Sequence, residues 1–144
     1  MFLAVDSSLG TSVAVVSSEG HILSERSSDD TRGHAENIGA LLQDALASAG
    51  ITAPDVTHVV MGVGPGPFTG LRVGMAAAEA FAHSRSLPLI PLVSHDAEAL
   101  GAGDVVVVTD ARRGEVAYSV YQGESVFRRV LGPALARPEN LEHE

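Results

Sequence analysis

Two short apolar runs and a third predicted strand, separated by turn residues, open the chain, and they constrain the fold more than any other feature of the sequence. The runs Phe2–Val5 and Thr11–Val16 flank the turn residues from Ser7 to Gly10, a pattern typical of a β-hairpin. A second polar turn follows and predicts a third strand over His21–Arg26. Because strands joined by such short turns pair antiparallel, the chain is expected to begin with a three-stranded meander.

Strands and helices alternate in the rest of the chain. Helices are predicted over residues 35–49, 70–84 and 94–100, and strands over 58–63, 89–93, 104–110, 115–122 and 125–131. The resulting order, βββαβαβ(α)ββ with a last strand over 125–131, predicts a mixed sheet flanked by helices, an α/β architecture without internal repeats. We expect a single lobe over residues 1–131 and an irregular tail over 132–144, where two prolines occur.

Composition excludes several classes of function. The chain contains neither Cys nor Lys, which excludes disulfides, thiol catalysis, cysteine–zinc sites and lysine Schiff-base chemistry. Nine arginines against eighteen acidic residues give a net charge of −9, which argues against a nucleic-acid-binding protein acting alone. The start has no basic segment typical of a signal peptide, and no apolar run approaches the ~20 residues of a membrane span. We therefore expect a cytoplasmic protein without membrane contact.

The first turn is a candidate nucleotide or anion loop. Backbone N–H groups and hydroxyls in such a hairpin can contact a phosphate, while the carboxylate holds a metal-bound water. The candidate residues are Asp6, Ser7, Ser8, Gly10 and Thr11. An ordinary polar turn has the same composition, so both interpretations stay open.

A segment rich in glycine and proline, from Gly64 to Gly74, joins a strand to the second helix. Thr69 is predicted to cap this helix, whose N-terminus could receive an anion, although the segment matches no known phosphate-binding fingerprint. Within the helix, Gly70, Gly74 and Ala78 recur every four residues, which allows another backbone to approach closely. This stripe could pack against the chain's own sheet or against a second protein, and both alternatives stay open.

The histidine spacing includes no i, i+4 pair and predicts no metal site of the common helical type. Asp110 ends the valine-rich strand and precedes two arginines, which indicates either a ligand site or a solvated turn. Together, Asp6 and Asp110 support an alternative hypothesis: a nucleotide- or metal-dependent hydrolase, either glycoprotease-like or ribonuclease-H-like. A nuclease of the latter type would also need a carboxylate on the strand over residues 57–63, which has none.

Four segments together resemble the TsaB (YeaZ) family, the non-catalytic partner of TsaD in making tRNA threonylcarbamoyladenosine. They are LAVDSSLGTSVAVV, GHAENIGALLQDAL, GPGPFTGLRVG and DARRGEVAYSVY, and they follow the family's order over most of residues 3–121. Pro67 stands where the family usually has Ser. The signature loop of the family corresponds here to Gly64, Gly66, Phe68, Thr69 and Arg72.

The resemblance implies an actin-like (ribonuclease-H-like) lobe and an accessory role, with no catalytic residues in this chain. In the catalytic sister TsaD, a comparable segment carries two histidines separated by three residues that bind a metal. Here His95 takes the first position and Ala99 the second, so we expect no bound metal. The resemblance also implies no stoichiometric cofactor, with ATP used by the complex rather than by this chain.

The implied partners are a second copy of the chain, a TsaD-like subunit and a TsaE-like ATPase, with tRNA contacted only through the complex. We expect the partner interface on the two long helices. Its predicted residues are Leu41, Leu42, Gly70, Leu71, Gly74, Met75 and Ala78.

Overall fold

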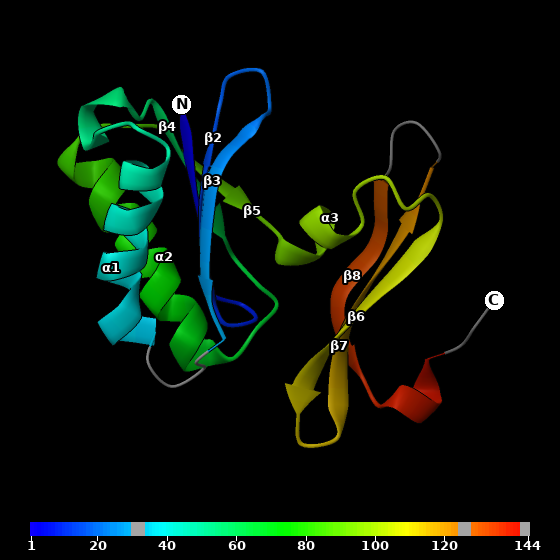
Figure 1. The fold of residues 1–144 in the computed structure, drawn as a ribbon. Helices are drawn as coiled ribbons and strands as arrows, with labels where there is room; N and C mark the ends of the chain where they lie inside the picture. The colour runs from blue at the N-terminus through cyan, green and yellow to red at the C-terminus, as the bar shows by residue number, and fades with distance from the viewer. Residues whose placement is uncertain (30–33, 124–127, 142–144) are drawn as a thin grey trace. The chain divides into compact units, whose positions relative to one another are not determined.

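The computed structural model describes residues 1–29, 34–123 and 128–141, and the chain forms two compact units, Met1–Leu92 and Val93–Glu144 (Figure 1). This differs from the single lobe predicted for residues 1–131. The physical reason is that the strands form two separate sheets, each of which pairs only strands of its own unit. No helix in the described part of the chain is both long enough and apolar enough to cross a membrane.

The first unit contains the predicted mixed sheet, and the α/β class is confirmed. Its five strands lie in the order β3-β2-β1-β4-β5. The meander β1–β2–β3 is antiparallel as predicted, whereas β4 pairs parallel to β1 and β5 parallel to β4. The strands are β1 (Phe2–Asp6), β2 (Thr11–Val16), β3 (Ile22–Ser28), β4 (His58–Gly62) and β5 (Leu89–Leu92).

Two long helices, α1 (His34–Ser48) and α2 (Phe68–Ser84), pack against this sheet and against each other (Figure 1). Helix α1 contacts β2 and β3, and α2 contacts β1 and β4. Between the helices and the sheet lies a core of Leu3, Val5, Val13, Val15 and Val59, all buried. Because side chains alternate along a strand, the period-two pattern of β1 and β2 directs these residues to one face. A 3₁₀ turn, η1 (Ala53–Asp55), precedes β4.

The second unit consists of a short helix and an antiparallel sheet of order β6-β7-β8. Three strands follow α3, as predicted from the strands expected over residues 104–110, 115–122 and 125–131. The strand β8 includes residues 132–136 of the predicted irregular tail, because Ala134 and Ala136 pair with β7. The first residues of the predicted strand 125–131 and the last three residues of the tail lie outside the described residues. The elements are α3 (Ser94–Glu98), β6 (Val105–Arg112), β7 (Glu115–Gln122), β8 (Arg128–Ala136) and η2 (Pro138–Asn140).

Candidate functional site

The first turn of the chain packs directly onto helix α2. The hydroxyl of Ser7, which is 1% exposed, donates to the carbonyl oxygen of Gly70 at 2.8 Å and accepts from the N–H of Gly74 at 3.2 Å. A Cβ atom on Gly74 would overlap the Ser7 hydroxyl. The stripe of Gly70, Gly74 and Ala78 is buried and packs within its own unit. Of the two partners that the sequence left open, the stripe contacts the chain's own unit. The partner interface predicted over these three residues stays a prediction.

The signature loop fits against the same turn through its glycines. A Cβ on Gly66 would lie 2.6 Å from the Cα of Ser8, and a Cβ on Gly62 would overlap the carboxylate of Asp6. Gly64 has a φ of 91°, a conformation that favours glycine. The glycine pattern of this segment thus follows from close packing inside the unit, without reference to a ligand.

Helix α2 begins at Phe68 and has Pro67 at its N-cap, with no side-chain capping bond, so the prediction of Thr69 as the cap was wrong. Proline leads into the helix because its φ, −58° here, is already helical. Phe68 is 73% exposed, and the guanidinium of Arg72 lies 5.1 Å from its ring centroid. These two residues of the signature loop form an exposed cation–π pair.

The side chains of the candidate anion loop make hydrogen bonds within the chain. Asp6 Oδ1 accepts from the backbone N–H of Ser8 at 2.7 Å and from its hydroxyl at 2.5 Å. Ser8 and Thr11 are buried. The polar groups of the turn therefore bond to one another. This arrangement is expected of an ordinary polar turn, one of the two interpretations that the sequence left open.

The second unit repeats this arrangement. Asp110 Oδ1 accepts from the N–H of Arg112 at 3.2 Å, again two residues further along the chain. In both units a glycine of positive φ follows the aspartate by four residues: Gly10 at 90° and Gly114 at 76°. The sequence analysis missed this repeat because only the aspartate, the glycine and the strand order are shared. Asp6 and Asp110 lie in different units.

A buried polar cluster in the second unit surrounds His95, which is 1% exposed. Its Nδ1 lies 2.9 Å from the hydroxyl of Ser119, and its Nε2 lies 2.9 Å from the hydroxyl of Thr109. Burial lowers the pKa of His95, which favours the neutral ring. Ala99 is also buried. Among the described residues, no three His, Cys, Asp or Glu side chains gather where they could hold a metal.

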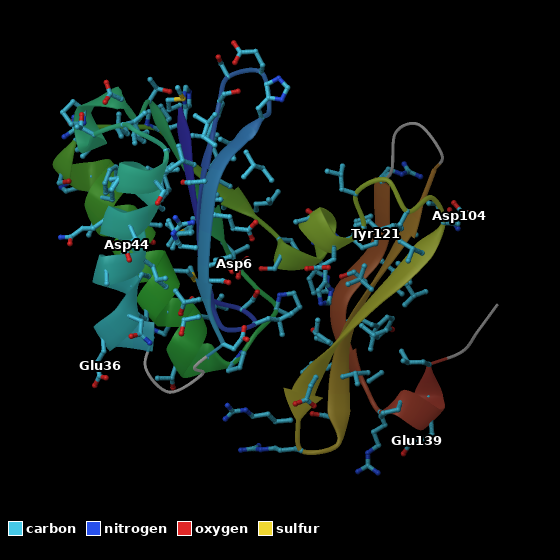
Figure 2. All side chains as sticks on the ribbon, in the orientation of Figure 1. Asp6, Glu36, Asp44, Asp104, Tyr121 and Glu139 are labelled. Atoms are coloured by element: carbon cyan, nitrogen blue, oxygen red, sulfur yellow. The ribbon has the colours of Figure 1, made fainter. Side chains whose placement is uncertain are left out.

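The same cluster extends to Tyr121, whose hydroxyl donates to Asp96 at 2.6 Å (Figure 2). Burial and the neighbouring Asp96 carboxylate raise the pKa of Tyr121 to about 12. Arg129 forms an ion pair with Asp96 at 3.6 Å. Sequence reasoning missed this cluster, although Ser119 and Tyr121 occupy alternate positions of one strand and therefore share a face.

The apolar residues predicted for a partner interface are all half-buried: Leu41, Leu42, Leu71 and Met75. All except Leu71 pack against the core of the first unit. The solvent side of α2 carries Ala76 and Ala80 instead, and α1 exposes Gly39 and Ala40. Figure 2 shows Glu36 and Asp44 of α1 pointing away from the sheet. Small residues and scattered charges thus form the outer surface of the helix pair.

Comparison with known proteins identifies related chains. Residues 15–143 match the sequence model of the family TsaD, described as tRNA N6-adenosine threonylcarbamoyltransferase. The chain is 40% identical over 145 residues to an uncharacterized protein of Mycobacterium leprae, and 45% identical over 117 residues to one of Mycobacterium tuberculosis. These matches cover 97% and 79% of this chain, but only 40% and 53% of the relatives. The chain thus spans about half the length of these relatives, or less.

Two further matches carry informative names. A tRNA N6-adenosine threonylcarbamoyltransferase of Streptococcus mutans is 41% identical over 120 residues, which are 72% of this chain and 35% of the enzyme. The solved structure of YeaZ from Pseudomonas aeruginosa superposes with a TM-score of 0.83 at 27% identity, covering 99% of this chain and 69% of that one. A second structure from the same organism, similar to peptidase YeaZ, gives a TM-score of 0.84.

Proposed function

Because the chain belongs to the TsaD family and, within it, to the YeaZ (TsaB) proteins, we propose that it is an accessory subunit in making threonylcarbamoyladenosine at adenosine 37 of tRNA. One observation carries the accessory role. The polar groups that a catalytic site of this chain would use are bonded to the chain itself: Ser7 to α2, Ser8 to Asp6, and His95 to two hydroxyls. Such groups stabilise the fold and are not free to act on a substrate.

The proposed partners are a TsaD-like catalytic subunit and a second copy of this chain, with a TsaE-like ATPase joining the complex. ATP is used by the complex, and this chain holds no nucleotide of its own. Supporting this, the turn proposed from the sequence as a phosphate site has its hydroxyl-bearing residues buried against α2 and the signature loop. We expect tRNA to be bound by the assembled complex.

We propose the solvent side of α1 and α2 as the partner surface, with Leu41, Leu42, Leu71 and Met75 at its margin. Ala76 and Ala80 are exposed one turn apart on α2. Their small side chains would let a partner helix approach closely, as helix pairs with interaxial distances of ~8–10 Å require. The buried stripe on the opposite side of α2 holds the helix on its own sheet.

The test is co-purification with the TsaD-like protein encoded in the same genome. Ala76→Glu should weaken the complex by roughly 30-fold in Kd, because a carboxylate in a dry interface costs about 2 kcal/mol or more. The thermal midpoint of the isolated chain should stay unchanged, since Ala76 is exposed. Ala97→Glu, at an exposed position of α3, is the matched control and should leave the complex intact.

Two results would contradict the proposal. One is the absence of any complex with the TsaD-like subunit. The other is undiminished threonylcarbamoyladenosine in tRNA after the gene for this chain is deleted. Magnesium-dependent ATP hydrolysis by the pure chain, abolished by Asp6→Ala, would favour the hydrolase alternative instead.

A further inference from the structure

We propose that the turn between β6 and β7 contacts the phosphate backbone of tRNA through Arg112 and Arg113. The inference rests on the proposed function and names one place where this chain would touch the substrate of the complex. Arg112 has a φ of 67° and Arg113 a φ of 56°, in the left-handed region that favours glycine.

Other residues would adopt the backbone conformation of this turn at a lower steric cost than arginine. Arg112 pairs with Glu115, so Arg113 and Gly114 form a two-residue hairpin loop, and both have positive φ. Loops of this kind prefer Asn-Gly or Gly-Gly, because these residues adopt positive φ at little steric cost. Folding alone therefore does not explain two consecutive arginines at positions 112 and 113.

The two guanidinium groups are also available. Both arginines are exposed, and neither side chain makes a hydrogen bond or ion pair with a described residue. Asp110, the nearest carboxylate along β6, bonds the backbone N–H of Arg112 rather than its guanidinium. Other arginines are engaged within the chain: Arg26 with Ser48, Arg72 with Phe68, Arg129 with Asp96 and Arg137 with Glu139.

A ligand for Arg112 and Arg113 must be anionic, and its surface must be accessible to the end of a narrow hairpin. The planar fork of a guanidinium matches phosphate oxygens, and phosphate contacts position RNA without reading its sequence. The net charge of −9 argues against tight binding by this chain alone. It is compatible with one local contact inside a complex whose other subunit binds the rest of the tRNA. Among anions, we assign the tRNA backbone rather than a free nucleotide.

The experiment measures binding of a fluorescent unmodified tRNA transcript to the complex of this chain with its TsaD-like subunit, across a range of salt concentrations. The variant R112N/R113N removes both charges and substitutes a residue that tolerates positive φ. It should weaken tRNA binding about ten-fold at low salt and reduce the slope of log K against log salt by about two. The thermal midpoint of the chain should rise or stay equal, because the turn is relieved of strain.

Matched variants separate a local contact from general charge. R85N/R128N removes two exposed arginines for which no side-chain hydrogen bond or ion pair with a described residue is found, and should leave the affinity and the slope unchanged. R112K/R113K keeps both charges and should retain most of the binding.

Unchanged binding by R112N/R113N in an intact complex would overturn the inference and leave the proposed function standing. Equal loss in R85N/R128N, or no tRNA binding by the unmodified complex, would also overturn it. Competition by ATP at matched ionic strength would assign the arginines to a nucleotide and equally contradict the proposal. Failure of the two subunits to associate would contradict the proposed function itself.

Discussion

At the scale of single residues, the contact between Ser7 and Gly74 decides how α2 sits on its sheet. The Ser7 hydroxyl bonds the helix backbone at Gly70 and Gly74, and no space remains for a Cβ at position 74. A buried hydroxyl that lost these bonds would carry an uncompensated polar group. Gly70 and Gly74 of α2 are therefore packed directly against Ser7 of the first turn, although 67 residues separate Ser7 from Gly74.

Gly74→Ala should lower the free energy of unfolding by about 1–3 kcal/mol, because the new methyl overlaps Ser7. Urea denaturation measures the change. Gly39→Ala on α1, where nothing lies within 4 Å of the added Cβ, is the control and should be neutral or stabilising by up to about 1 kcal/mol. Ser7→Gly combined with Gly74→Ala should recover part of the loss. Equal stability of the Gly74→Ala and Gly39→Ala variants would contradict this account of the contact.

His95 predicts a pH dependence of stability. Burial holds its pKa below the ordinary value of 6.5, partly offset by Asp96 and Glu98 and reinforced by Arg129. In the unfolded chain the ring therefore binds a proton at higher pH than in the fold. The stability that the neutral ring contributes is complete above pH ~6.5 and is lost as the pH falls from there through the lower folded pKa.

Unfolding free energies between pH 5 and pH 8 measure this effect. His95→Gln keeps a side chain that can bond Ser119 and Thr109 but cannot take up a proton in this range, so it should flatten the profile. His83→Gln, at an exposed position of α2, should leave the profile as it is. A profile for His95→Gln as steep as that of the unchanged protein would contradict the assignment.

At the scale of elements, β6 is an edge strand of the second sheet and has two exposed apolar side chains on one face. Among the described strands it pairs with β7 alone, and Val106 and Val108 remain 47% and 44% exposed. A long apolar strand at the edge of a sheet is a template for pairing with another chain. The run of valines in β6 thus has one face open within the described unit.

Val108→Lys should reduce concentration-dependent aggregation of the chain through the edge of this sheet, while changing the unfolding free energy by less than about 1 kcal/mol, since the side chain is exposed. Light scattering across a concentration series checks the first effect. Val107→Lys is the contrast: Val107 is half-buried and pairs with Ser119, so the same charge should destabilise the unit. Self-association that persists unchanged in Val108→Lys would show that another surface is responsible.

At the scale of the whole molecule, the two units differ in their apolar cores. The first unit has a large buried core, and the second has a small one. Met1–Leu92 contains the buried apolar cluster beneath α1 and α2. A fragment of residues 1–92 should therefore fold cooperatively on its own, with a sigmoidal urea transition by circular dichroism. A fragment of residues 93–144 should not, because a unit of this size buries too little surface to offset its conformational entropy. A broad, non-cooperative transition of the first fragment would contradict this division.

The sequence by itself determined the features that depend on neighbouring residues. Periodicity placed the opening meander, both long helices and the valine strand, because each pattern reflects a face turned toward a core. The order of strands and helices indicated the α/β class, and the four matching sequence segments carried the family resemblance.

Tertiary structure alone decided which side of each element meets which partner. The stripe of Gly70, Gly74 and Ala78 suited a partner protein and the chain's own sheet equally well, and only the position of Ser7 distinguished them. Likewise, His95 resembled half of a metal site until Thr109 and Ser119 were found bonded to both ring nitrogens. In each case the deciding contact joins residues distant in sequence. A pattern read along the chain contains the spacing of such residues but no information on their distance in space.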